Sequence, residues 1–222
     1  PVIRNDESAS LFWIDMSGMR HEPGGSAFSQ TIGSLGTVAP GVADAEYFAA
    51  TFETLQLMIK DDRIIAGHDI SAGGMIVTLL EMCFANREGG MTLNLTEIGE
   101  TDTVRLLYSQ NPGVIIQVRD EAETEEFLYE RGVRFASIGH PVRERKLSIV
   151  NGDNHFEFDI DRCRSLWYRS SYLLDRRQCG PVLARERYDN HGEKAIKFDL
   201  KNFKGSFRSQ GITPDRKATT GV

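Results

Sequence analysis

The chain has 222 residues, of which 40% are hydrophobic and 26% are charged, a balance typical of a globular protein with a sizeable core. Its net charge of −6 argues against a dedicated nucleic-acid-binding protein, because such proteins are usually basic. No apolar run approaches the roughly 20 residues that cross a bilayer and no signal peptide is evident, so we expect a cytoplasmic protein without a membrane partner.

The first part of the chain predicts a buried strand and two helices. The apolar run Leu11–Met16 suits the strand. After a break in the pattern, Ser26 is the expected cap of a helix over 27–32. From 45 to 59 the apolar residues follow the 3.6-residue period of a helix, and Asp44 stands in the capping position.

A second strand, 63–66, leads into a glycine turn, and the helix expected after that turn is the most apolar in the chain. Nearly every residue from Met75 to Phe84 is apolar, and Glu81 interrupts the run. A helix of this composition is expected to be buried on most sides.

The remainder alternates strands and helices and then forms a hairpin and a longer helix. Asn151-Gly152 between two β runs is the strongest short hairpin signal that a sequence offers. The whole pattern predicts an α/β fold or α+β sandwich in which helices flank a mixed β-sheet. The expected strands are 91–95, 113–118, 135–138, 146–150 and 155–158, and the expected helices are 103–108, 121–130 and 161–177.

The chain divides into a domain and a tail. Residues 1–191 hold the periodic segments, whereas 192–222 are polar and rich in Lys, Gly, Ser and Thr, which is the composition of a linker. Because the chain starts at Pro1 without an initiator Met and ends without a closing structural signal, we expect it to be part of a longer polypeptide.

The turn Asp69–Gly74, with the sequence Asp-Ile-Ser-Ala-Gly-Gly, is the most informative segment. A helix N-terminus offers free N–H groups and a partial positive charge to a phosphate, and two glycines let a ligand approach the backbone. The Ser71 hydroxyl can bond a phosphate oxygen. The Asp69 carboxylate would repel phosphate unless a divalent cation such as Mg²⁺ bridges the two. The turn therefore predicts a nucleotide-phosphate and metal site.

The same residues have a simpler interpretation. Ser or Asp before two glycines is also an ordinary helix cap, and His68 can be a hydrogen-bonded turn residue. The segment is neither G-x-G-x-x-G nor a P-loop, because no Lys follows the glycines. Composition and spacing leave both interpretations open.

Five segments in the same order resemble the aminoimidazole-ribonucleotide-synthase-like superfamily and, within it, the phosphoribosylformylglycinamidine (FGAM) synthase family of purine biosynthesis. The turn with its helix resembles the superfamily's Asp-x-Ser-Asp-Gly-Gly-Leu segment, although Ala72 stands where Asp is usual, which argues against a second metal or polar contact there. The segments are GHDISAGGMIVTLLEMCFA (67–85), LFWIDMSG (11–18), GGSAFSQ (24–30), PGVIIQVR (112–119) and the helix that contains Trp167.

The resemblance implies a role and a set of site residues. Residues 1–191 would be the second synthase-like C-terminal domain of the long enzyme, and 192–222 the linker toward its glutaminase domain. That enzyme is a ligase that uses ATP and ammonia released from glutamine to convert formylglycinamide ribonucleotide to the amidine. The resemblance implies that Asp69 is a Mg²⁺ ligand and Ser71 a contact of ATP or ADP, and that Gly73 and Gly74 are the helix-opening glycines of the nucleotide site.

The resemblance also implies partners, namely the ATP-binding synthase domains and the glutaminase domain of the same polypeptide, so the isolated chain is expected to be inactive. The family has two pseudo-equivalent halves, and one of its two nucleotide sites is structural; this half is expected to complete that auxiliary site. The glutaminase nucleophile would lie beyond Val222, so it is none of the three unpaired cysteines. Cys83 is expected to be a buried thiol, and unpaired cysteines fit a reducing compartment.

Two other features of the sequence, and the function itself, have more than one interpretation. Gly24–Ser26 could approach a ligand, although a Ser-capped helix entry is the simpler interpretation. The arginines of 161–177 could meet a neighbouring domain or an anionic substrate, although a solvated helix face is simpler. The competing function is a non-catalytic interaction domain whose glycine turn only caps a core helix. Other enzymes of the superfamily, such as relatives of selenophosphate synthetase or thiamine-phosphate kinase, share the turn but match the other segments poorly.

Overall fold

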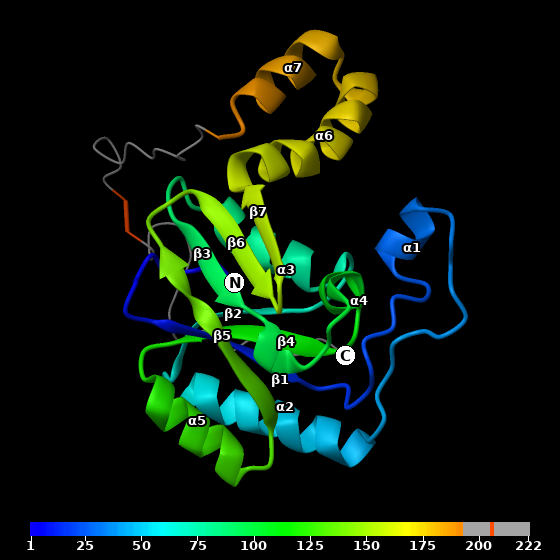
Figure 1. Cartoon of the computed structure of the whole chain (residues 1–222). Helices are drawn as coiled ribbons and strands as arrows, with labels where there is room; N and C mark the ends of the chain where they lie inside the picture. Colours follow the sequence, from blue (N-terminus) through cyan, green and yellow to red (C-terminus); the bar gives the residue numbers. More distant parts are fainter. Residues whose placement is uncertain (193–204, 207–222) are drawn as a thin grey trace, which may run out of the picture.

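The computed structural model describes residues 1–192 and 205–206, so the expected linker lies almost wholly outside the described residues. A seven-stranded sheet forms the centre of the described part, in the order β2-β4-β1-β5-β3-β6-β7 (Figure 1). All neighbouring strands run antiparallel except β3 and β6, which are parallel. The expected mixed sheet is confirmed. Its strands are β1 (Ser10–Asp15), β2 (Ile64–Asp69), β3 (Gly90–Asn94), β4 (Gly113–Val118), β5 (Arg134–Val142), β6 (Lys146–Asn151) and β7 (Asn154–Asp159).

Helices cover both faces of the sheet because the side chains of a strand alternate between the faces. In β1, Leu11 belongs to the core under α3 (Gly74–Phe84) and α4 (Thr103–Tyr108), whereas Phe12 belongs to the core under α2 (Ala45–Lys60) and α5 (Glu121–Glu130). Figure 1 shows α2 and α5 together on one side and α3 on the other. None of the helices in the described ranges is long and apolar enough to cross a membrane.

The remaining helices lie at the margins of this sandwich. The short α1 (Ala27–Thr31) stands beside the sheet, and a 3-10 turn (Thr96–Ile98) follows β3. A hairpin of α6 (Ile160–Gln178) and α7 (Pro181–Asp189) follows β7 and projects from the body in Figure 1. Flanking helices and a mixed sheet are the architecture that the sequence predicts.

The structure confirms most elements and corrects two. The strand expected over 135–138 runs from Arg134 to Val142, because Gly139 lies at a register shift where β5 passes from β1 to β3. At Gly139 a Cβ would lie 2.1 Å from the Thr92 carbonyl oxygen, so a glycine at this position is what permits the pairing. Helix α7 was not predicted. Its Pro181 occupies the first turn, where proline loses no hydrogen bond because a backbone N–H in that turn has no acceptor within the helix.

We expect Leu79→Ala to lower the free energy of unfolding by about 3 kcal/mol, because it leaves a cavity in a close-packed core. Leu79 is fully buried on α3 and belongs to the core on that face of the sheet. Urea denaturation measures the loss. The matched control is Leu57→Ala on the outer side of α2, where the side chain is 45% exposed and the expected loss is below about 1 kcal/mol. Equal losses for the two variants would contradict the assignment of α3 to the core.

Candidate nucleotide and metal site

The turn that joins β2 to α3 is fixed by backbone contacts. The Ile70 N–H donates to the Gly113 carbonyl at 2.8 Å, which holds the end of β2 against the start of β4. Gly73 and Gly74 take positive φ angles of 94° and 77°. A Cβ on Gly74 would lie 2.6 Å from the carbonyl oxygen of Leu107, so the helix can begin here only with a glycine.

The polar side chains of the turn are not used to cap the helix. Gly73 is the N-cap residue of α3, and no side chain accepts a hydrogen bond from the first turn. The Asp69 carboxylate is 75% exposed, and Ser71 is also exposed. The interpretation of Asp69 or Ser71 as an ordinary side-chain cap is therefore wrong. Both side chains lie at the surface with their oxygens available to a ligand.

Two N–H groups at the start of α3 already have partners. Gly74 N–H donates to the Ser71 carbonyl at 3.0 Å. With its amide oxygen turned toward the donors, Gln110 accepts from the Gly73 N–H and from the Ala27 N–H, both at 2.9 Å. One amide thus joins the N-termini of α3 and α1. The expected nucleotide contacts of Gly73 and Gly74 stay predictions, and these two N–H groups are not free for a phosphate.

A chain of polar contacts connects Asp69 to α6. The His68 ring lies with Nδ1 2.8 Å from the Asp69 carbonyl oxygen and with Nε2 3.5 Å from a Glu81 carboxylate oxygen. The other Glu81 oxygen accepts from the Trp167 indole N–H at 3.0 Å. The Thr78 hydroxyl also donates to the Asp69 carbonyl, at 3.0 Å. Glu81, the charged residue that interrupts the apolar helix in the sequence, therefore supports the backbone next to Asp69.

Two cavities border the strand ends near the turn. One, of about 740 Å³, is mostly apolar; Phe52 and Ile59 of α2 line it together with His68 and Asp69. The other, of about 690 Å³, is lined by charged groups at the end of β1, where Asp15 lies 3.6 Å from Arg134. Burial lowers the pKa of His21 in this second cavity, which favours the neutral form of its ring.

Sequence reasoning missed Asp15, which is the second carboxylate at this edge of the sheet. The β1 and β2 strands both run antiparallel to β4, so their C-terminal ends lie on either side of its start: Asp15 pairs with Gly113 and Asp69 with Val114. Asp15 is 7% exposed, and it accepts from the Ser17 N–H and hydroxyl. An acidic residue directly after an apolar run was the available signal.

Two secondary candidates, Gly24–Ser26 and Cys83, take the simpler of their interpretations. Ser26 caps α1, accepting from the Ser29 N–H at 3.2 Å, and Gly24 packs against the backbone of Val38. Cys83 is a buried free thiol, as expected, and burial raises its pKa to about 12, so it is not a nucleophile. Among the described residues, no group of three His, Cys, Asp or Glu side chains could hold a metal ion.

The sequence and the fold have counterparts among known proteins. Residues 16–151 match the family described as AIR synthase related protein, C-terminal domain. The chain is 30% identical over 193 residues to phosphoribosylformylglycinamidine synthase of Homo sapiens, a match that covers 84% of this chain and 14% of that protein. The chain thus spans a small part of the length of this relative.

Solved structures from Thermotoga maritima share the fold. PurLQS superposes with a TM-score of 0.56 at 11% identity, over 73% of this chain and 27% of that chain. PurL complexed with FGAR gives 0.57 at 12% identity, over 73% and 29%. PurL complexed with ATP gives 0.55 at 11% identity, over 72% and 26%. The expected AIR-synthase-like fold is confirmed.

We expect Gln110→Ala to destabilise the protein by about 1–3 kcal/mol, because it removes the acceptor shared by the backbone N–H groups of the half-buried Gly73 and of Ala27. Gln110→Glu keeps an acceptor and adds a negative charge at the N-terminus of α3, so it should stabilise the protein relative to wild type by about 0.5 kcal/mol. Thermal and urea unfolding measure both. The control Gln178→Ala, at an exposed position at the end of α6, should be nearly neutral. Similar losses for Gln110→Ala and Gln178→Ala would refute the bridging role.

Proposed function

The chain belongs to the AIR synthase related C-terminal domain family, and we propose that it forms one such domain of an ATP- and glutamine-dependent ligase that converts formylglycinamide ribonucleotide to formylglycinamidine ribonucleotide in de novo purine biosynthesis. The sequence likeness to the human synthase supports this proposal. The rest of the longer polypeptide, including ATP-binding synthase domains and a glutaminase domain, supplies the other parts. Residues 1–191 form the domain and 192–222 the linker, and the enzyme works in the cytoplasm.

One observation carries the assignment of a nucleotide site to this chain. Asp69 and Ser71 open a buried helix, yet their side chains do not cap it and face the solvent. A carboxylate and a hydroxyl held at a strand end, beside a helix N-terminus, have the chemistry of a Mg²⁺-phosphate contact. Ala72 offers no further oxygen between them.

The residues present fit one part of such a site. Mg²⁺ in nucleotide sites is commonly held by one or two carboxylates together with phosphate oxygens and water. The Asp69 carboxylate would supply a protein oxygen for the metal, and the Ser71 hydroxyl would donate to a phosphate of ATP or ADP. When bound, Mg²⁺ neutralises phosphate charge next to Asp69. Because the described residues contain no three-residue metal cluster, the remaining ligands come from the nucleotide and from the other domains.

The role of each residue in this chain follows from its place. Asp69 would hold the metal and Ser71 would orient a phosphate. His68 and Thr78 fix the Asp69 backbone, and Glu81 orients the His68 ring. We expect the nucleotide here to stabilise the enzyme in the manner of the auxiliary site. If the nucleotide were instead catalytic, a change of Asp69 would lower turnover directly, without a loss of stability.

In the longer polypeptide that carries this chain, we expect Asp69→Asn and Ser71→Ala to lower the amount of co-purified nucleotide at least tenfold and about threefold respectively. The first variant removes the negative charge of a metal-binding carboxylate, and the second removes a single hydrogen bond to phosphate. Nucleotide extracted from the pure protein and quantified by chromatography gives the result. Asp153→Asn, an exposed carboxylate in the β6–β7 turn, is the matched control and should leave the nucleotide content unchanged.

Turnover measured on the same variants separates the two roles. Loss of nucleotide with turnover reduced only in step with thermal stability indicates the structural site. Loss of turnover at unchanged stability indicates a catalytic one. Wild-type nucleotide content and stability in Asp69→Asn would contradict the ligand site and favour the non-catalytic interaction domain.

Binding of Mg²⁺-ATP at Asp69 should also change the fluorescence of Trp167, because the indole N–H donates to Glu81, which faces the ring of His68. The expected change persists in Trp13→Phe and disappears in Trp167→Phe. Glu81→Gln should keep an acceptor for the indole while weakening nucleotide binding several-fold, since the charge beside His68 is gone. A fluorescence change that survives Trp167→Phe would show that this connection does not report on the site.

A further inference from the structure

The α6–α7 hairpin is attached to the body through the first two turns of α6. Ile160 is fully buried, and the Arg164 guanidinium donates to the Phe84 carbonyl at 3.1 Å. Trp167 packs on Phe84, with ring centroids 5.9 Å apart. The side-chain bonds found farther along α6 are internal to the hairpin, such as the 2.6 Å ion pair between Arg187 and Asp175. The far half of the hairpin therefore projects from the sandwich (Figure 1).

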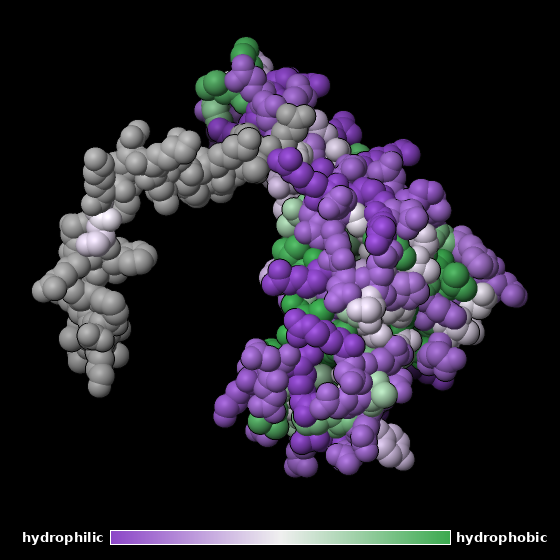
Figure 2. Space-filling model, turned by 90° about the vertical axis from the view of Figure 1, so that its left-hand side faces the viewer, coloured by the Kyte–Doolittle hydropathy of each residue, from purple (hydrophilic) through white to green (hydrophobic). Residues whose placement is uncertain are grey.

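Large aliphatic side chains are exposed at the far end of this hairpin. Figure 2 shows hydrophobic residues gathered there, above a mostly hydrophilic surface. A cluster of this kind on a projecting arm is typical of an interface and is unfavourable in water. The side chains are Leu173 (48% exposed), Leu174 (59%), Val182 (68%) and Leu183 (58%).

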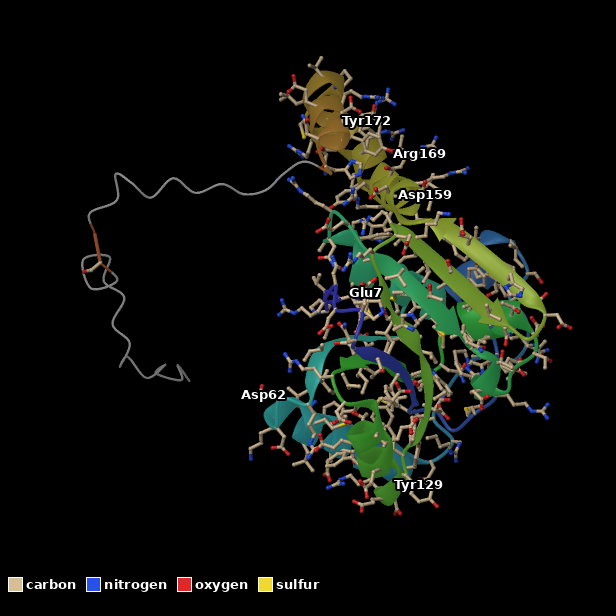
Figure 3. All side chains as sticks on the ribbon, turned by 60° about the vertical axis from the view of Figure 1, so that its left-hand side comes forward. Glu7, Asp62, Tyr129, Asp159, Arg169 and Tyr172 are labelled. Atoms are coloured by element: carbon tan, nitrogen blue, oxygen red, sulfur yellow. The ribbon has the colours of Figure 1, made fainter. Side chains whose placement is uncertain are left out.

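Arginines without ion pairs accompany these aliphatic residues on α6. Arg162, Arg169 and Arg177 have no carboxylate within ion-pair distance among the described residues (Arg169 in Figure 3). Three of the four acids of the hairpin are already engaged: Asp161 with Arg164, Asp175 with Arg187 and Asp189 with Arg185. A chain of net charge −6 thus presents a locally basic surface with an apolar end.

We propose that the hairpin beyond the first two turns of α6, which exposes Leu173, Leu174, Val182 and Leu183 and carries the unpaired Arg169 and Arg177, docks an acidic surface with an apolar centre on another domain of the same longer polypeptide. This inference rests on the proposed function in one respect, namely that the chain is a part of a larger protein. Arginine next to buried aliphatic side chains is the composition of interface centres, and complementary charge selects the partner.

Charge and length decide between the possible occupants. A second copy would bring an equally basic hairpin, and like charges repel at close range. A nucleic acid would leave the aliphatic end without a partner. The human relative is far longer than this chain, which covers 14% of it, so most of a comparable polypeptide lies outside these residues. A tethered domain meets the hairpin at an effective concentration of the order of millimolar, at which a modest surface suffices.

Site-specific photocrosslinking in the longer polypeptide tests the docking. A benzophenone side chain replaces Leu174, and in a control it replaces Tyr129, which is 81% exposed on α5. We expect an intramolecular crosslink from position 174 to an acidic segment outside residues 1–222, and none from position 129. An absent crosslink, a crosslink between two copies, or one to lipid or nucleic acid would overturn the proposal.

Charge reversal adds a second measurement. Arg169→Glu with Arg177→Glu should lower the yield of the position-174 crosslink at least fivefold, whereas Arg119→Glu, at an exposed site on the sheet, should not. An unchanged yield in the double variant would overturn the electrostatic part of the proposal. The amount of bound nucleotide, measured on the same protein, distinguishes failure of the docking proposal from failure of the proposed nucleotide site. Loss of nucleotide on Asp69→Asn with no crosslink at position 174 would leave the proposed function standing and remove the docking surface.

Discussion

The close approach of Gly74 to the backbone at the C-terminal end of α4 is the constraint on which the site depends. A side chain there would meet the carbonyl oxygens of Leu107 and Ser109 at 2.6 and 2.8 Å, and the positive φ angle independently favours glycine. Because α3 begins against α4, its apolar side chains enter the core at once, and the preceding residues stay outside it. The close packing of Gly74 therefore leaves Asp69 and Ser71 at the surface.

Charged side chains gather in two regions of this fold, acidic ones where β1 and β2 end and basic ones on the α6–α7 hairpin. At the sheet edge, Asp69 and Asp15 flank the start of β4, and each is supported by hydrogen bonds that fix its backbone or its carboxylate. On the hairpin, arginines exceed the acids available to them. The connection through Trp167, Glu81 and His68 joins the two regions, so the proposed docking surface on α6 and the proposed ligand site at Asp69 belong to one packed unit.

Local patterns predicted much of this structure. The periodicity of α2 and α3, the Asp44 and Ser26 caps and the Asn151-Gly152 hairpin all depend on neighbours a few residues apart, and each is confirmed. Gln110, by contrast, bridges two helices that meet only in the folded chain, and Glu81 finds Trp167 86 residues away. The extension of β5 escaped prediction because Gly139 and Pro141 ordinarily end strands, and α7 because few of its residues are buried. Asp69 and Ser71 were predicted as site residues and stay predictions, whereas Asp15, the second carboxylate at this end of the strands, was not singled out.

The central claim is that Asp69 is a metal ligand next to a bound nucleotide. Anomalous diffraction from crystals of the longer polypeptide, grown with Mn²⁺ in place of Mg²⁺ and with ADP, tests it most directly. The account predicts a metal peak about 2.1 Å from an Asp69 carboxylate oxygen, with a phosphate oxygen in the same coordination sphere. A nucleotide-bound structure in which no metal lies within coordination distance of Asp69 would contradict it.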